Sequence, residues 1–256
     1  PGLPSDTFYY NNPGYYLVQL TTTDTISNQS NSYVYPDSII VHPKPNTDFI
    51  PHNVCVGVQD TFYHNSNINT LAGLNPQESI NLWEWEVSNN NGISYTTVSA
   101  SPDLIHTFPS DGQWLIRLTC WSNYGCSRSI VYPITVYPLP SPPTATSTPS
   151  CFGETVYDLT ASGAGTNIIR WYDASVSTLL YTGNPYATGE TSCNIYTYQV
   201  TQTDINTCES NPTPVTHQIY CLPTAEFSYN WNSLGGCGSG IAQFDGSISD
   251  DGDGTI

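Results

Sequence analysis

The chain has 256 residues, and its 4 Lys and Arg against 21 Asp and Glu give a formal net charge of −17. A surface this acidic repels nucleic-acid phosphates and anionic lipids, so we expect no nucleic acid as a partner. No apolar run reaches the length of about 18 residues that a membrane-spanning helix needs, so we expect no membrane insertion in this segment. The 12% of aromatic residues is typical of folded proteins, and the 19 Gly and 20 Pro disfavour long helices.

The first predicted element is a strand that begins after Gly14. Residues 8–21 align with residues 106–119, and in both segments apolar side chains follow the glycine at every second position. These positions are Tyr16, Val18 and Leu20 in the first copy and Trp114, Ile116 and Leu118 in the second. Alternation with a period of two after a glycine predicts a turn that leads into a half-buried strand.

This repeat divides the chain into units. Both copies end in Pro-rich segments, so we expect residues 1–45 to be the last part of one unit and residues 46–140 to be a complete one. Residues 224–256 repeat the opening of the complete unit. The matching positions are Phe49, Cys55 and Phe62 in one unit and Phe227, Cys237 and Phe244 in the other. Since the chain contains no Met, we interpret it as an internal piece of a longer protein.

Residues 141–223 form a different unit of the same style. Residues 168–172, 196–201 and 215–219 read as strands, and Trp171 is expected in their core. No segment shows the helical period of about 3.6 residues. The predicted fold class is therefore all-β, with tandem β-sandwiches in an extended array that Pro-rich, semi-rigid linkers join.

Residues 82–87 read Leu-Trp-Glu-Trp-Glu-Val, and residues 106–118 contain a turn and the strand after it. Together they resemble the central strands of a PKD (polycystic-kidney-disease-type) domain, which is an immunoglobulin-like sandwich. The sequence after Trp85 departs from the W-D-F-G-D-G of that family. Residues 244–256 look like the family's opening, F-D-x-S-x-S-x-D-x-D-G-x-I, and residues 1–45 look like its final strands.

The unit at 141–223 carries four further motifs: Cys-Phe-Gly-Glu at 151–154, Ile-Arg-Trp-Tyr at 169–172, Leu-Tyr-Thr-Gly-Asn-Pro-Tyr at 180–186 and Cys-Glu-Ser at 208–210. It is similar to the immunoglobulin-like modules of large surface proteins of the Bacteroidota. Alternating PKD-type and immunoglobulin-like modules are typical of long adhesins and gliding-motility filaments that the type IX route secretes. The resemblance implies a structural stalk of an extracellular, cell-surface protein and no enzymatic activity.

The resemblance also implies partners. These are the neighbouring repeats of the same chain, with surface polysaccharide or other filament subunits in addition. The alternative function is a spacer or carbohydrate-binding region of a secreted multidomain hydrolase, for which Trp121 and Trp231 are the tryptophans expected to be exposed. The glycine-rich segment around Cys237 resembles a nucleophile loop, but the repeat explains this cysteine better, and no HExxH, GxSxG or P-loop motif is present.

One group of acidic residues is spaced as in a calcium loop. Asp250, Asp251 and Asp253 offer carboxylate oxygens at short intervals, and some PKD-type domains bind calcium, which is the one cofactor that the sequence suggests. The alternative, which we favour, is an Asx/Gly turn in which Asp side chains accept hydrogen bonds from nearby N–H groups.

The eight cysteines include no CxxC pair, so disulfides in an oxidising compartment explain them better than a metal site does. We predict the pairs Cys55–Cys126, Cys151–Cys208 and Cys193–Cys221. Cys193 begins a predicted strand and Cys221 follows the closing strand, and adjacent antiparallel strands bring such ends together. Cys120 continues the apolar alternation of its strand, so we expect a free and buried thiol there.

Two short segments resemble glycosylation sites. Asp24-Thr25-Ile26 and Asp37-Ser38-Ile39 look like the Asp-Ser/Thr-aliphatic sites that Bacteroidota O-glycosylate. This resemblance predicts glycans on Thr25 and Ser38. Glycans and the acidic, Lys-poor surface both suit a soluble stalk outside the cell.

Overall fold

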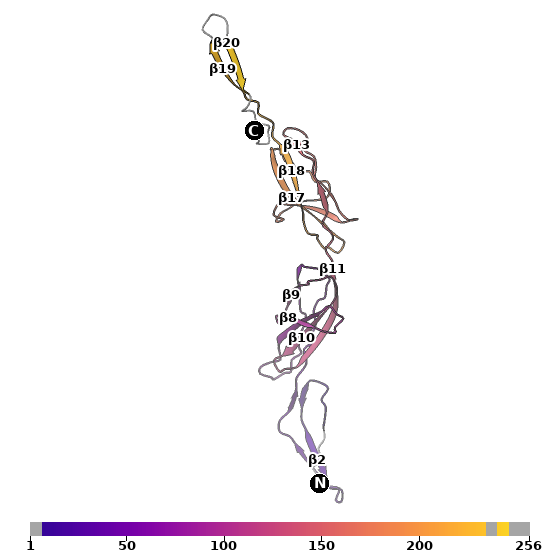
Figure 1. Ribbon diagram of the computed structural model, residues 1–256. Coiled ribbons are helices and arrows are strands. Elements are labelled where there is room, and N and C mark those ends of the chain that lie inside the picture. The colour runs from indigo at the N-terminus through magenta and orange to yellow at the C-terminus, as the bar shows by residue number, and fades with distance from the viewer. Residues whose placement is uncertain (1–6, 234–239, 246–256) are drawn as a thin grey trace. The chain divides into compact units, whose positions relative to one another are not determined.

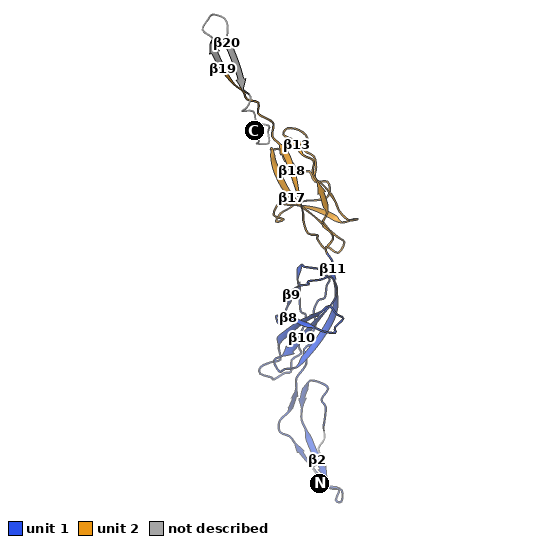
Figure 2. Ribbon diagram, viewed as in Figure 1, with its two compact units in different colours: residues 1–138 blue, residues 139–256 orange. Residues whose placement is uncertain are grey.

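A computed structural model of the chain describes residues 7–233 and 240–245, which form strands and loops without a helix (Figure 1). Within these residues there is accordingly no helix long and apolar enough to cross a membrane. The chain divides into two compact units, residues 1–138 and 139–256 (Figure 2). The predicted all-β fold class is confirmed, and the predicted domain bounds inside each unit stay predictions.

Unit 1 begins with one long antiparallel hairpin. Its strands are β1 (Gly14–Tyr16), β2 (Gln19–Thr23), β3 (Ser30–Val34) and β4 (Ile39–Val41). β1 pairs with β4, and β2 pairs with β3 across the turn at residues 24–29. Val18 and Leu20 continue the predicted alternation, but they are 38% and 64% exposed. Among the described residues, no second sheet covers this hairpin.

The rest of unit 1 is a β-sandwich. Its strands are β5 (Val54–Cys55), β6 (Gln59–Phe62), β7 (Ile80–Ser88), β8 (Thr96–Ser99), β9 (Leu104–Thr107), β10 (Gly112–Ser122) and β11 (Ser127–Tyr137). The larger sheet has the order β5-β11-β10-β7-β8, and the smaller sheet pairs β6 with β9. All pairs are antiparallel except that of the two-residue β5, which runs parallel to the end of β11.

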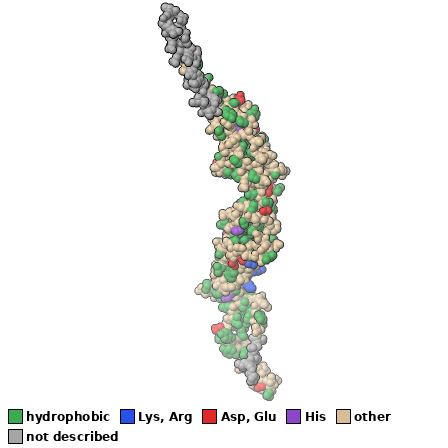
Figure 3. All heavy atoms as spheres, viewed as in Figure 1, with side chains coloured by type: hydrophobic (Ala, Val, Ile, Leu, Met, Phe, Trp, Pro, Cys, Tyr) green, Lys and Arg blue, Asp and Glu red, His purple; other side chains and the backbone are tan. Residues whose placement is uncertain are grey.

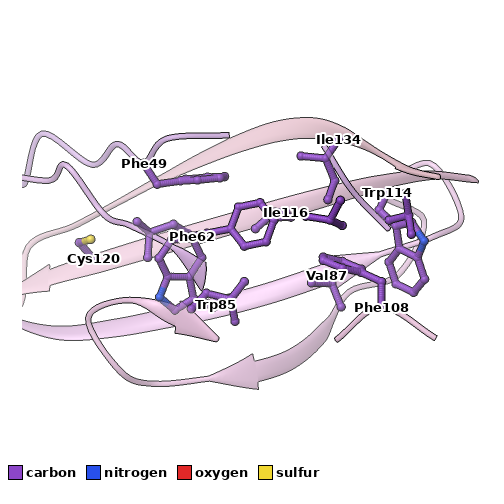
Figure 4. Close-up of a cluster of buried hydrophobic side chains, with 13 residues drawn as sticks. Phe49, Phe62, Trp85, Val87, Phe108, Trp114, Ile116, Cys120 and Ile134 are labelled. Atoms are coloured by element: carbon purple, nitrogen blue, oxygen red, sulfur yellow. The ribbon is translucent and has the colours of Figure 1, made fainter. Parts of the chain in front are cut away.

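The core of this sandwich is built from alternate residues of its strands (Figure 4). On β10 the alternation predicted from the sequence is buried: Trp114, Ile116, Leu118 and Cys120. Aromatic side chains from other segments pack with them: Phe49, Phe62, Trp85 and Phe108. The indole N–H of Trp85 donates a hydrogen bond of 3.0 Å to the carbonyl oxygen of Ser101, so the polar atom of this buried ring is satisfied. The thiol of Cys120 is buried and free, as predicted.

Unit 2 contains a second β-sandwich. Its strands are β12 (Thr144–Thr146), β13 (Ser150–Cys151), β14 (Thr160–Ser162), β15 (Ile168–Asp173), β16 (Leu179–Thr182), β17 (Asn194–Thr203) and β18 (Thr213–Tyr220). The larger sheet has the order β13-β18-β17-β15-β16, and β12 pairs with β14. Trp171 of β15 is fully buried, as predicted, and its indole N–H donates to the carbonyl oxygen of Gly183 at 3.0 Å.

The two larger sheets follow the same plan. In each, a two-residue first strand lies parallel to the last strand. The second-last strand is in the middle of the sheet, and the strand with the buried Trp lies between it and an edge strand. Trp85 of β7 and Trp171 of β15 lie on equivalent strands, and both are fully buried. This strand order around a buried tryptophan is that of an immunoglobulin-like sandwich.

The last described strands follow the second sandwich. β19 (Ser228–Ser233) and β20 (Gly240–Asp245) form an antiparallel pair. The candidate calcium residues lie outside the described residues, as does one cysteine. These are Asp250, Asp251, Asp253 and Cys237.

Candidate functional site

The first candidate site is a cysteine at the end of the first strand of each larger sheet. Cys55 lies opposite Tyr137 in the parallel pairing of β5 with β11, and Cys151 lies opposite Tyr220 in the pairing of β13 with β18. In both sandwiches the next residue donates its backbone N–H to the carbonyl of that tyrosine at 2.9 Å. A glycine with positive φ, 74° at Gly57 and 85° in the second sandwich, then turns the chain away. The two cysteines therefore occupy equivalent positions.

The second candidate site is a cysteine in the turn between the last two strands. The N–H of Ser122 donates to the carbonyl of Cys126 at 2.8 Å, and the N–H of Asp204 donates to the carbonyl of Cys208 at 3.0 Å. The same two residues accept with their side chains from the cysteine N–H, at 3.2 Å and 2.9 Å. Cys126 and Cys208 are therefore also equivalent.

The bonding state differs between these equivalent positions. Cys55 and Cys208 are disulfide-bonded, whereas Cys126 and Cys151 are free. The predicted pairs Cys55–Cys126 and Cys151–Cys208 are therefore wrong.

Strand length explains the error. Cys55 pairs with the last residue of β11, whereas Cys126 immediately precedes its first residue. A strand of 11 residues, at a rise of about 3.3 Å per residue, separates the two cysteines by roughly 30 Å or more. A disulfide needs Cα atoms within about 7 Å. The sequence predicts the turn with Cys126 and the first strand with Cys55, but it does not show that these two segments lie at opposite ends of the sandwich.

The third predicted pair is present. Cys193 and Cys221 form a disulfide with a Cα–Cα distance of 4.9 Å and a sequence separation of 28 residues. Cys193 immediately precedes β17 and Cys221 immediately follows β18, so both lie close to the paired residues Asn194 and Ile219. Adjacent antiparallel strands bring these two ends together, and the sequence predicts the bond on the same ground.

An apolar cleft in unit 1 is the candidate for ligand binding. It has a volume of about 370 Å³ and is lined by Leu82, Trp83, Glu84, Thr97, Ala100 and Trp121. Trp121 is half-buried and Leu82 is 55% exposed. The indole nitrogen of Trp83 is buried and has no hydrogen-bond partner among the described residues. The sequence predicts that Trp121 and Trp231 are exposed; Trp121 is half-buried, and the side chain of Trp231 lies outside the described part of the structure.

Each sandwich pairs an arginine with a glutamate on the outer face of its larger sheet. Arg117 donates to both carboxylate oxygens of Glu86, at 2.5 Å and 2.6 Å, and lies 3.9 Å above the ring of Tyr95. Hydrogen bonding to Glu86 raises the pKa of Arg117 above its ordinary value. In unit 2, Arg170 lies 3.3 Å from Glu209.

The carboxylate of Glu209 also accepts hydrogen bonds from two hydroxyl groups. It accepts from the Tyr172 hydroxyl at 2.7 Å and from that of Thr201 at 2.5 Å. Burial, and then this hydrogen bond, raises the pKa of Tyr172. Arg117 and Arg170, two of the four Lys and Arg residues of the chain, thus contact carboxylates. Little positive charge is left for acidic partners, and the face drawn in Figure 3 shows few basic side chains.

The predicted glycosylation residues lie on exposed loops and strand ends. Thr25 follows Asp24, whose carboxylate accepts the N–H of Ile26 at 2.7 Å, and this hydrogen bond lowers the pKa of Asp24. Thr25 and Ser38 are both exposed, so their hydroxyl groups are accessible to a modifying enzyme. The predicted glycans stay a prediction.

The structure offers no metal centre in the residues that it describes. In this part of the chain, no three His, Cys, Asp or Glu side chains lie together as metal ligands do. Three histidines contact one polar side chain each instead: His42 lies 3.3 Å from Glu78, His52 lies 3.2 Å from Asp60, and His217 lies 2.9 Å from Ser147. Such contacts are typical of structural histidines.

The chain matches no protein-family model and no curated protein. It resembles the fibronectin(III)-like modules of Clostridium thermocellum CbhA, with 14% identity, a TM-score of 0.34 and coverage of 79% of this chain and 95% of that one. It also resembles the FN1–FN3 domains of chicken CNTN1, with 10% identity, a TM-score of 0.38 and coverage of 79% and 77%. Carbohydrate-binding modules of a β-sandwich superfamily match at 13% identity and a TM-score of 0.30, covering 69% and 84%. At these scores, the assignment of the fold rests on the strand order within each sandwich.

Proposed function

We propose that this chain is a structural stalk segment of a long extracellular repeat protein, which acts as a surface adhesin or as a motility or attachment filament. The observation that carries the proposal is the repetition of one strand order in two sandwiches, each closed around its own core. Repeats of this kind need only contacts with their neighbours, so many of them can be added in a row. Neighbouring repeats of the same chain are then the first partners, and surface polysaccharide or other filament subunits are further ones.

The cysteine chemistry supports an extracellular location. Disulfides persist in oxidising compartments, and Cys193–Cys221 joins strands of one sheet. Under tension, the residues between these two cysteines cannot be pulled out of the fold. The PKD-type character of residues 46–140, the Bacteroidota origin and the type IX route belong to the same proposal, on the sequence resemblance alone.

Small-angle X-ray scattering of the chain tests the stalk. A compact protein of 256 residues has a radius of gyration of about 18 Å. We expect a clearly larger value, because separate sandwiches in a row do not share a core. A radius near the compact value would contradict the stalk. Immunolabelling of intact cells then tests the cell-surface location, which an antibody signal found only inside the cells would contradict.

The cleft beside Trp121 favours the alternative, a carbohydrate-binding region of a secreted hydrolase. Its tryptophan and leucine offer an apolar surface on which a sugar ring can stack. Calorimetric titration of the chain with soluble polysaccharides, with a Trp121→Ala variant as control, separates the two functions. Binding that Trp121→Ala abolishes supports the alternative, and the full-length gene decides further, because it encodes either many similar modules or a neighbouring catalytic domain.

A further inference from the structure

The outer face of the larger sheet in unit 1 carries an apolar row of side chains. Side chains of a strand alternate between the two faces of a sheet. Trp85 of β7 points into the core, so Leu82 of the same strand belongs to the outer face, and the same alternation on β10 places Trp121 there. Leu82 and Trp121 lie opposite each other in the register of the two strands. Both line the cleft of about 370 Å³, a volume within the usual range of small-ligand clefts.

The row beside it on the same face is polar. Thr119 lies opposite Glu84 on one side and opposite Ser129 on the other. The hydroxyl group of Thr119 lies 2.8 Å from that of Ser129. The hydroxyl group of Thr97 donates to the Glu84 carboxylate at 3.3 Å. Thr97 and Ser129 are exposed and Glu84 is half-buried, so both ends of this polar row are open to solvent.

The arginine of the next row is already neutralised. Arg117 donates to both carboxylate oxygens of Glu86 and lies over the ring of Tyr95. An acidic ligand on this face would therefore meet a guanidinium that is already paired, the carboxylate of Glu84 and an overall charge of −17. Because like charges repel, the face disfavours acidic ligands.

The sandwich of unit 2 has the same strand order but different side chains at these positions. Counted from the buried tryptophan of each sandwich, Trp121 of unit 1 corresponds to Thr203 of unit 2. By the same count, Glu84 corresponds to Arg170, which reverses the charge. The neighbouring apolar and polar rows are therefore a property of unit 1 and not a consequence of the strand order.

We propose that these two rows bind a neutral polysaccharide. A sugar ring has one apolar face of C–H groups and an edge of hydroxyl groups. Its apolar face stacks on the ring of Trp121 beside Leu82, and its hydroxyl groups donate to the carboxylate of Glu84, which is a strong acceptor. Uronic acid and sulfate groups are repelled. The inference rests on polysaccharide being a partner, as proposed above, and it holds for a stalk and for a region of a hydrolase alike.

Native gel electrophoresis with polysaccharide cast into the gel tests the proposal, because the acidic chain migrates readily and a bound polysaccharide slows it. The neutral probes are galactomannan and laminarin, and the acidic probe is polygalacturonate. The variants are Trp121→Ala, Trp121→Phe and Glu84→Gln. Tyr95→Ala is the matched control, because it also removes an aromatic ring from this sandwich, but one that Arg117 already covers. A cooperative thermal transition in each variant shows that it folds.

We expect at least one neutral probe to slow the parent chain and polygalacturonate to leave its migration unchanged. Trp121→Ala should weaken the binding about tenfold or more, because it removes the stacking surface, whereas Trp121→Phe keeps a ring and should keep most of the affinity. Glu84→Gln should weaken the binding several-fold, because hydrogen bonds to a charged acceptor are the stronger ones. Tyr95→Ala should bind as the parent does.

Each other outcome contradicts a separate part of the proposal. Equal binding of polygalacturonate would overturn the neutral class and leave polysaccharide as a partner. Migration of the parent that neither neutral probe slows would overturn both, while the stalk would still be decided by the scattering experiment. Equal losses in Trp121→Ala and Tyr95→Ala, or an unchanged affinity of Glu84→Gln, would show that the two rows are not the binding site.

Discussion

The two sandwiches share a strand order but are stabilised differently. The core of unit 1 has 13 buried residues, with aromatic rings from several strands. The core cluster of unit 2 is smaller: Leu159, Ile169, Trp171, Tyr198, Val200 and Val215. Unit 2 adds a disulfide across its two longest strands, Cys193–Cys221. One strand order thus accommodates a sandwich held mainly by apolar burial and another in which a covalent link supplements a smaller core.

Unit 2 also buries a polar side chain in its sandwich, that of Gln202. Inside unit 2, the Gln202 side chain accepts from the N–H of Ala164 at 2.7 Å and donates to the carbonyl of Ser141 at 2.5 Å. Gln202 is 2% exposed, so these bonds satisfy a polar group that would otherwise destabilise the core. When such a buried polar group has all its hydrogen bonds, it makes the core rigid and specifies a unique arrangement.

The largest expected effect is the loss of the fully buried tryptophan of either sandwich. Trp85→Ala in unit 1 and Trp171→Ala in unit 2 each remove a fully buried ring and should lower the free energy of unfolding of their own sandwich by about 3–5 kcal/mol. Hydrogen exchange followed by mass spectrometry measures each sandwich separately. We expect protection to fall only in the unit that carries the change.

The tryptophan variants also test the independence of the two cores. Trp→Phe at the same positions is the matched control, because it keeps an aromatic ring but removes the hydrogen bond to Ser101 or Gly183. A smaller loss is expected from it. If either alanine variant lowered protection equally in both units, the separation into two cores would be wrong.

The second effect concerns the disulfide. Replacing both Cys193 and Cys221 by Ala opens a loop of 28 residues, and the entropy regained by the unfolded chain should cost unit 2 about 3–4 kcal/mol. Urea denaturation monitored by hydrogen exchange should show this loss in unit 2 alone. An unchanged stability of unit 2 would mean that its small core suffices without the disulfide, which would contradict a covalent contribution to its stability.

The sequence predicts what depends on local pattern. The alternation through Trp114 and Cys120 gave the buried face of β10 because period two needs only the strand itself. The Cys193–Cys221 bond followed from two adjacent strands. The predicted bonds of Cys55 and Cys126 failed because they depend on which end of an 11-residue strand each cysteine occupies, which the pairing of β5 with β11 decides.

The sequence also does not show the register in which strands that are far apart in the chain pair with each other. Arg117 meets Glu86 because β7 and β10 pair in a register that places these residues opposite each other. The Trp121 cleft depends on the same register, which sets Trp121 opposite Leu82. A charged or aromatic residue in a strand shows no partner until that register is known.

A third, smaller effect compares the outer faces. Glu86→Gln removes the negative charge to which two nitrogens of Arg117 donate hydrogen bonds. It should destabilise unit 1 by about 1 kcal/mol, because the ion pair is partly buried and bidentate. Glu209→Gln in unit 2 should cost less, since Arg170 makes a single, longer contact of 3.3 Å. Denaturation of the two variants at low salt and at high salt checks this order. Equal losses that salt does not change would contradict an electrostatic cause.

The smallest effect is a difference in acid sensitivity between equivalent turns. In unit 2, the turn after β15 is organised by a charged group, because Asp173 accepts hydrogen bonds from the Ser175 hydroxyl at 2.6 Å and from the Thr178 N–H at 3.0 Å. These bonds lower the pKa of Asp173 to about 2. In unit 1, the turn after β7 is organised by the neutral Ser88 and Asn90, whose side chains lie 2.7 Å apart.

The sign of the pH dependence follows from these pKa values. A carboxylate whose pKa is lower in the folded state stabilises the fold above its ordinary pKa of 3.8, and this stabilisation is lost as the pH falls toward about 2. Over that range the stability of unit 2 should fall more steeply in the parent protein than in Asp173→Asn, which cannot titrate. His217, which is buried and also titrates, is common to both proteins and cancels in the difference. Ser88→Ala in unit 1 should lower stability equally at every pH, because no charge is removed. Parallel pH profiles of the parent and Asp173→Asn would show that the Asp173 carboxylate does not hold this turn.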